Sequence, residues 1–267
     1  LGETTFAGSA YLLAGSSVSI AQAGTLLAGD VRLREGGTFT SFSDARPGSV
    51  ADLGLTPSGV VLYAPGVFST PGYRAIFGLG APGIPNAVGV QVVPGTAGAV
   101  QVASFPESDT PSFYHLCARL AGGTVSCWGI NGYGEVGNGS AAPEVYTASD
   151  VGLTGVTDVC VGSSHSCAVT GGVAHCWGRN AELQGSFGLE TSNVPLAVQG
   201  LPATVADVTC GAYHTCATLQ DGSLWCWGRN VEGQLGAGKR SPSEAPSQVG
   251  ITGVKKVAAA GTHTCAI

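Results

Sequence analysis

Residues 214–238 read HTCATLQDGSLWCWGRNVEGQLGAG, and the fold can be worked out from this stretch. Short runs of small, β-branched and aromatic residues alternate in it with turn residues, and no helical period is present, so it predicts short antiparallel strands. The loop Gln220-Asp221-Gly222 has glycine where a three-residue hairpin needs a left-handed residue. Counting outward from this loop places Cys216 directly opposite Cys226.

The same pattern recurs through the second half of the chain. VTDVCVGSSHSC ending at Cys167, VADVTCGAYHTC ending at Cys216 and VKKVAAAGTHTC ending at Cys265 align without gaps. A looser copy precedes them, in which His115 and Cys117 are followed by C-W-G at residues 127–129. Repeats of roughly 40 to 50 residues with several short strands are typical of propeller blades. The sequence therefore predicts an all-β fold, an incomplete β-propeller with units at about residues 102–155, 156–204, 205–253 and a truncated 254–267.

The quoted stretch resembles the repeat of the regulator-of-chromosome-condensation family, and the resemblance covers about residues 102–267. It implies a ring of blades, usually seven. The cysteines in H-x-C and C-W-G are similar to those of exported bacterial members. Three repeats and a fragment do not fill such a ring, so we expect an open arc whose ends need a partner. No active-site residue follows from the resemblance, because it resides in the blade framework.

One loop of the second repeat departs from this pattern. Residues 180–185 read NAELQG where the third repeat has NVEGQLG at residues 230–236. The glycine that serves a special backbone conformation has therefore moved. We expect the loop at residues 180–186 to be remodelled.

The cysteines of the H-x-C and C-W-G motifs are predicted to form disulfides. A loop at residues 121–123 and a two-residue Gly171-Gly172 turn give the first two repeats the same opposition of cysteines as the third. Opposed strand positions approach disulfide spacing, and zinc is disfavoured because C-x-x-C knuckles are absent. The predicted pairs are Cys117 with Cys127, Cys167 with Cys176, and Cys216 with Cys226. Stable disulfides imply an extracellular or cell-surface location, and the periplasm also fits.

Three cysteines remain outside these pairs. Cys160 and Cys210 lie near the starts of successive units, one position out of register, and an inter-blade disulfide between them is one option. Cys265 occupies the H-x-C position of a unit whose C-W-G partner would lie beyond Ile267. Truncation or pairing with another chain would account for it.

Residues 1–101 lack the repeat marks but still read as β-rich. Strands are expected at residues 31–34, 60–63 and 88–93, between glycine and proline turns. Divergent blades, a sandwich and a solenoid-like segment all fit, and we favour a distinct β domain. Leu1 is not an initiator methionine and no signal segment opens the chain, so the sequence reads as a mature or trimmed product. Polar residues and prolines interrupt the uncharged stretches, which excludes a helical membrane span.

Composition disfavours nucleic acid as a partner and gives no support to catalysis. Charged residues make up 10% of the chain, with 11 Lys and Arg against 17 Asp and Glu and a net charge of −6. No nucleophile elbow, H-E-x-x-H, phosphate loop or carboxylate pair is present, so we predict that the protein is not an enzyme and takes no metal or cofactor. A G-x-G-x-x-G match at residues 78–83 is discarded, since Pro82 and Pro85 prevent the helix that a dinucleotide site requires.

Exposed residues that do not recur are the candidate contacts. The recurring histidines and the tryptophans of C-W-G are expected to be structural. Trp225 differs, because its position holds Ser126 and His175 in the other repeats. Arg229 recurs as Arg179 but is Ile130 in the first repeat. Aromatic and arginine side chains dominate binding hot spots, and the predicted partner-binding residues are Tyr133, Tyr213, Trp225 and Arg229.

These features favour an exported, non-catalytic interaction or structural module of a bacterial cell-surface or extracellular assembly, such as an adhesion or filament component. Its partner would be another protein or copies of itself, with a glycan as a further candidate. The alternative is a secreted protein-binding inhibitor, since the resembling family includes a secreted β-lactamase inhibitor. Guanine-nucleotide exchange, also known in that family, fits much less well because it would place the cysteine pairs in a reducing compartment.

Overall fold

A computed structural model describes residues 89–106, 113–186, 188–202 and 204–267, together with the backbone of six earlier strands. These six strands are β1 (Ala10–Leu12), β2 (Ser17–Ile20), β3 (Val31–Arg34), β4 (Thr38–Ser41), β5 (Asp52–Thr56) and β6 (Gly59–Ala64). Every regular element in the described part of the chain is a β-strand. It contains no helix long and apolar enough to cross a membrane.

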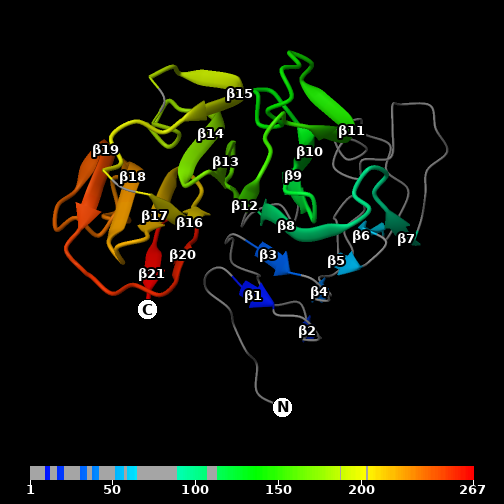
Figure 1. The fold of residues 1–267 in the computed structure, drawn as a ribbon, viewed down its shortest axis with the longest axis horizontal. Helices are drawn as coiled ribbons and strands as arrows, with labels where there is room; N and C mark the ends of the chain where they lie inside the picture. Colours follow the sequence, from blue (N-terminus) through cyan, green and yellow to red (C-terminus); the bar gives the residue numbers. More distant parts are fainter. Residues whose placement is uncertain are drawn as a thin grey trace.

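Three four-stranded antiparallel units follow one another along an arc, with one strand pair after them (Figure 1). Blade 1 comprises β8 (Ala99–Pro106), β9 (Phe113–Leu120), β10 (Val125–Ile130) and β11 (Glu144–Asp150). Blade 2 comprises β12 (Val156–Val161), β13 (His165–Thr170), β14 (Val173–Arg179) and β15 (Thr191–Ala197). Blade 3 comprises β16 (Val205–Cys210), β17 (His214–Leu219), β18 (Leu224–Asn230) and β19 (Ser241–Val249), and the pair is β20 (Val257–Ala259) with β21 (Thr264–Ala266). The predicted all-β, partial propeller fold is confirmed.

The middle hairpin of each blade has the register that turn counting predicts. Cys117 faces Cys127, Cys167 faces Cys176, and Cys216 faces Cys226. The glycine of each C-W-G motif lies where the hairpin meets the loop before H-x-C. At Gly178, φ is +91° and an added Cβ would lie 2.7 Å from the carbonyl oxygen of Ser164. Only glycine combines this φ with so close a backbone approach, which explains the motif.

The first hundred residues contribute strands to two sheets. β3 pairs antiparallel with β8 and parallel with β1, so it extends the sheet of blade 1. A second sheet has the order β2-β4-β5-β6-β7, with β7 at Gly89–Val92. The strands expected at residues 31–34, 60–63 and 88–93 correspond to β3, β6 and β7. The boundary proposed after residue 101 falls inside β8, and a separate N-terminal domain stays a prediction.

The core lies between neighbouring blades. Trp177 of blade 2 is fully buried in a cluster with blade 1 residues that include Val125 and Val136. Trp227 of blade 3 is likewise buried against blade 2 residues that include Val169 and Val198. Because each tryptophan fills the space next to the preceding blade, its burial supplies inter-blade cohesion as well as hairpin packing.

The loops that follow the C-W-G motifs, at residues 131–137, 180–186 and 230–236, share one conformation. The amide of Leu183 donates to the carbonyl of Asn180 at 2.9 Å, as the amide of Gly233 does to Asn230 at 3.1 Å. Leu183 and Ser186 take left-handed φ values of 61° and 48°. The expectation of a remodelled loop at residues 180–186 is therefore wrong, because side-chain-bearing residues here adopt the conformation that glycine adopts elsewhere.

Replacing Leu183 with glycine should stabilise the protein by about 1 kcal/mol, because a left-handed backbone is strained in residues that carry a Cβ. The melting temperature should rise by about 2 to 4 °C. The reverse change, Gly233→Leu, is the matched control and should lower it by a similar amount. A melting temperature that falls in Leu183→Gly would show that leucine packing outweighs the strain.

Candidate protein-interaction face

Each blade is joined to the next by the same polar contact. The carbonyl oxygen of Glu135 in blade 1 accepts the indole N–H of Trp177 at 2.7 Å and the hydroxyl of Ser166 at 3.1 Å. The Nε2 atom of His115 lies 2.8 Å from the same hydroxyl oxygen. One blade further on, the carbonyl of Gln184 accepts Trp227 at 2.9 Å and Thr215 at 2.8 Å. The recurring His, hydroxyl and Trp residues of the repeat thus meet across blades.

These contacts determine the protonation of the buried histidines. Ser166 has a single hydroxyl hydrogen and donates it to Glu135, so His115 must donate its Nε2–H to the serine oxygen. The Nδ1 atoms of His115, His165 and His214 are buried and have no hydrogen-bond partner in the described residues. Burial lowers the pKa of His115 and His165 from 6.5 to about 3, and that of His214 to about 4. The three rings are neutral, structural members of the joints, as their recurrence predicts.

Glu135 is a buried carboxyl in a position that holds glutamine in the other repeats. Its Oε2 accepts the amide of Tyr133 at 2.8 Å, the contact that Gln184 makes with the amide of Glu182. Burial raises the pKa of Glu135 from 4.5 to about 7, and backbone hydrogen bonds only partly oppose this. An amide side chain satisfies the same loop without a charge.

Glu135→Gln should therefore stabilise the protein above neutral pH. The folded pKa lies above the unfolded value, so stability falls as pH rises through this interval and the loss is complete above about pH 7. The free energy of unfolding of the variant should exceed that of the wild type by roughly 3 kcal/mol at pH 8, and the two should be equal near pH 4. Denaturant unfolding at the two pH values checks this, and a difference that does not grow with pH would contradict it.

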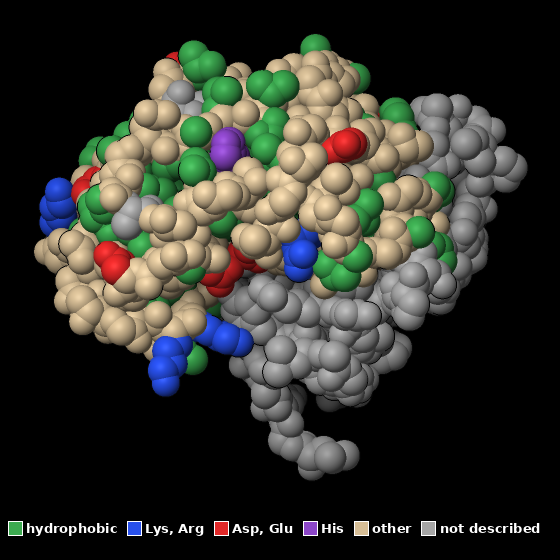
Figure 2. Space-filling model, in the orientation of Figure 1, with side chains coloured by type: hydrophobic (Ala, Val, Ile, Leu, Met, Phe, Trp, Pro, Cys, Tyr) green, Lys and Arg blue, Asp and Glu red, His purple; other side chains and the backbone are tan. Residues whose placement is uncertain are grey.

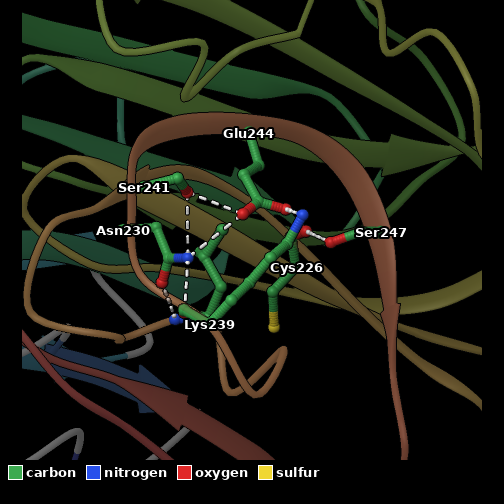
Figure 3. A network of polar contacts seen from close by, with 7 residues as sticks. Cys226, Asn230, Lys239, Ser241, Glu244 and Ser247 are labelled. Atoms are coloured by element: carbon green, nitrogen blue, oxygen red, sulfur yellow. Dashed lines mark hydrogen bonds and ion pairs between the residues drawn. The ribbon is translucent and has the colours of Figure 1, made fainter.

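An asparagine anchors each of the three loops. Asn230 donates from Nδ2 to the carbonyl of Lys239 and to the hydroxyl of Ser241, each at 3.1 Å, and lies near Glu244 (Figure 3). Its Oδ1 accepts the amide of Leu235 at 3.2 Å. Glu244 also forms an ion pair with Lys239 at 3.1 Å. Asn131 and Asn180 make the corresponding contacts, so the loop conformation is held rigidly in all three blades.

Two of the predicted contact residues meet on a third side chain. The guanidinium carbon of Arg179 lies 5.6 Å from the ring centroid of Tyr133 and 5.8 Å from that of Tyr213. Tyr133 comes from the loop of blade 1, Arg179 from the end of β14, and Tyr213 from the turn before β17. We call these three residues the Tyr–Arg–Tyr stack. Tyr133 is 49% exposed, so the stack is open to solvent on one side.

Arg229 lies one blade further along the same face. It makes an ion pair with Glu232, Nη2 to Oε1 at 3.1 Å, and its Nε also points to this carboxylate. The hydrogen bonds with Glu232 raise the pKa of Arg229 and lower that of Glu232. The backbone amide of Arg229 donates to the carbonyl of Tyr213 at 2.9 Å, which ties it to the stack. The sequence predicted Tyr133, Tyr213 and Arg229 as contact residues but not Arg179. The recurrence of an arginine at positions 179 and 229 could have pointed to it.

Trp225 does not belong to this face. Its ring is half-buried and packs on a cluster between blades 2 and 3, on which Leu196 and Leu201 also pack. Its indole nitrogen is buried without a hydrogen-bond partner in the described residues. Trp225 is thus half-buried and not fully exposed, and its role as a partner contact stays a prediction.

Trp225→Ala should destabilise the protein by about 3 kcal/mol, because it removes a large packed ring. Trp225→Phe should cost less, since it removes the unpaired N–H together with part of the ring. Arg229→Ala, which breaks only a solvent-exposed ion pair, should stay within about 0.5 kcal/mol of the wild type. Equal effects of the two alanine variants on denaturant unfolding would show that Trp225 is not framework.

Four disulfides are present. They join Cys117 to Cys127, Cys167 to Cys176, Cys216 to Cys226 and Cys160 to Cys210. The last one crosses between blades 2 and 3, and the Sγ atoms of Cys160, Cys167 and Cys210 lie within 4.8 Å of one another. Cys265 is free and exposed. Four disulfides indicate an oxidising location outside the cytoplasm.

Comparison with known proteins agrees with this architecture. Residues 205–234 and 221–267 match the regulator of chromosome condensation (RCC1) repeat. Residues 205–267 are therefore similar to this repeat. The quoted stretch at residues 214–238 lies within the matched segments. No curated protein matches the sequence.

Solved structures of RCC1-type propellers share the fold. The crystal structure of Kap60 bound to yeast RCC1 (Prp20) has a TM-score of 0.59 and 19% identity, over 82% of this chain and 54% of that chain. Human WBSCR16 has a TM-score of 0.53 and 18% identity, over 86% of this chain and 71% of that chain. Prp20p from Saccharomyces cerevisiae has a TM-score of 0.52 and 14% identity, over 80% of this chain and 67% of that chain. This chain spans about half the length of the first of these structures. Such low identities show the fold alone.

Proposed function

We propose that this chain is an exported, non-catalytic protein-interaction module. The observation that carries the proposal is the Tyr–Arg–Tyr stack, in which three blades contribute to one partly exposed cluster. Aromatic and arginine side chains held in fixed positions are the usual anchors of protein interfaces. The backbone of each member is held. The amide of Arg179 donates to the carbonyl of Ser164 at 2.8 Å, the amide of Tyr133 donates to the Glu135 carboxylate, and the carbonyl of Tyr213 accepts the amide of Arg229 at 2.9 Å.

The four disulfides support export, and the low charge supports a protein partner over nucleic acid. Charged side chains lie singly or in small groups among uncharged surface on the face drawn in Figure 2. We further propose that the module serves a bacterial cell-surface or extracellular assembly. The G-x-G-x-x-G segment at residues 78–83 lies outside the described residues and has no part in the proposal.

The similar structures support a protein partner as well. One of them holds yeast RCC1 with Kap60, and another concerns the binding of Prp20p to Gsp1p and histones. A secreted protein-binding inhibitor is the second candidate, and the clustering of two tyrosines around an arginine on one face favours it. Nucleotide exchange fits poorly with disulfides, and binding to the phosphate backbone of chromatin fits poorly with a net charge of −6.

Native mass measurement tests the proposal and separates its two forms. An assembly component should give multiples of the 26.5 kDa chain, and Tyr133→Ala with Tyr213→Ala should reduce them to monomer. A binder should be monomeric alone and cross-link, through this face, to a different protein in the culture medium. Val173→Ser, an exposed position in the hairpin of blade 2, is the matched control. Assembly and cross-linking that are both unaffected by the tyrosine changes would exclude the proposed surface.

A further inference from the structure

The charge of Arg179 has no carboxylate partner in the described part of the chain. Its counterpart Arg229 pairs with Glu232, three residues later. Arg179 has Glu182 at the same offset but lies between two tyrosine rings instead. Glu182 contributes to the raised pKa of Arg229, so its charge serves the neighbouring arginine. Of the two arginines on this face, one is neutralised and the other is not.

The stack is only partly covered, since Tyr133 is 49% exposed and Arg179 and Tyr213 are partly exposed. A guanidinium group is planar, and its N–H bonds lie in that plane. The rings of Tyr133 and Tyr213 approach the group within 6 Å and occupy its surroundings as cation–π partners. The side chain is thereby pre-organised, so less conformational entropy is lost when its N–H groups find an acceptor. The fork of N–H donors matches the two oxygens of a carboxylate.

We propose that the Tyr–Arg–Tyr stack docks a single aspartate or glutamate carboxylate of a protein partner. This inference rests on the proposed protein-interaction function and names the group that the face recognises. Glu182 and Glu232 lie on the same face, and the chain carries a net charge of −6. A singly charged carboxylate is repelled by these groups less than a phosphate or a polyanion would be. The attraction for a carboxylate therefore comes from the positive charge of Arg179 and not from the surrounding surface.

Titration with short blocked peptides tests the proposal directly. The probe is acetyl-Gly-Glu-Gly-amide, compared with its Gln counterpart and with a phosphoserine counterpart. Ring resonances of Tyr133 and Tyr213, assigned with Tyr→Phe variants, report occupancy of the stack. We expect saturable shifts with the glutamate peptide and affinity weaker by at least about tenfold in Arg179→Ala. Lys255→Ala, which removes an exposed cation before β20, should bind as the wild type does.

Arg179→Lys keeps the charge and guards against a folding defect in the alanine variant. It lacks the planar fork, so its affinity should also fall, with an unchanged melting temperature. Equal binding of the glutamine peptide at the stack would overturn the carboxylate assignment and leave the protein-interaction function standing. Tighter binding of the phosphoserine peptide would replace carboxylate by phosphate. The inference would also be overturned if partner binding required both tyrosines but was unaffected by Arg179→Ala. If partner binding did not require the tyrosines either, the proposed protein-interaction function would itself be excluded.

Discussion

Lowering the pH from 7.5 to 5 should cost the fold about 6 kcal/mol through its three buried histidines, about 2 kcal/mol from each. The pKa of His115, His165 and His214 is lowered from 6.5 to between about 3 and about 4 by burial. Below pH 6.5 these three histidines are therefore protonated in the unfolded chain but stay neutral in the folded chain. Stability is complete above that pH and falls as the pH drops toward the folded pKa values.

Glu135 acts in the opposite direction, because its raised pKa gives the folded state a proton that the unfolded state releases. It should offset about 2 kcal/mol of the loss, so the full effect is expected in the Glu135→Gln background. Denaturant unfolding across this pH range measures both. His165→Gln should remove about a third of the histidine slope if the fold survives, and His175→Ala, an exposed histidine, is the control. A stability that is independent of pH in Glu135→Gln would falsify the assignment of neutral, buried rings.

Removing the inter-blade disulfide should destabilise the protein by about 4 kcal/mol, more than removing any hairpin disulfide. Cys160 and Cys210 are separated by 50 residues, whereas Cys117 and Cys127 are separated by 10. Loop-closure entropy then predicts about 4 kcal/mol for the long loop and about 2.7 kcal/mol for the short one. Both cysteines should be replaced together, since a single thiol left beside Cys167 can exchange with the hairpin disulfide.

The comparison is between Cys160→Ala with Cys210→Ala and Cys117→Ala with Cys127→Ala, by denaturant unfolding. Non-reducing peptide mapping of the wild type should recover the four pairs and label Cys265 alone. If the hairpin variant is the less stable of the two, loop entropy does not govern these bonds. If the fully reduced protein unfolds at the same denaturant concentration as the oxidised protein, the disulfides do not stabilise the fold.

Local features of the sequence predicted much of the framework. Hairpin register followed from glycine-containing loops such as residues 220–222, because a short turn leaves few ways to pair the flanking strands. The same local rule failed at residues 180–186. There, Leu183 and Ser186 occupy left-handed positions, because the Asn180 anchor and the neighbouring strands hold the loop in place. The tertiary context outweighs the conformational preference of the two residues.

The candidate site was only partly predictable. Tyr133 and Tyr213 stood out as aromatic residues outside the repeat pattern, but nothing in the sequence shows that Arg179 lies between them. Their separations along the chain, 46 and 34 residues, are set by how blades pack and not by any periodicity. The partial burial of Trp225 escaped the sequence for the same reason, because its ring packs on a cluster formed between blades 2 and 3.

By itself, the sequence determined the repeat, the strand pairs and the three hairpin disulfides, because these depend on residues close together in the chain. Only the tertiary structure decided which side chains meet across blades. It paired Cys160 with Cys210, buried the three histidines without a partner for Nδ1, and placed Arg179 between two tyrosines. Such contacts depend on the angle and spacing of whole blades, which the packing of Trp177 and Trp227 sets and no local pattern encodes.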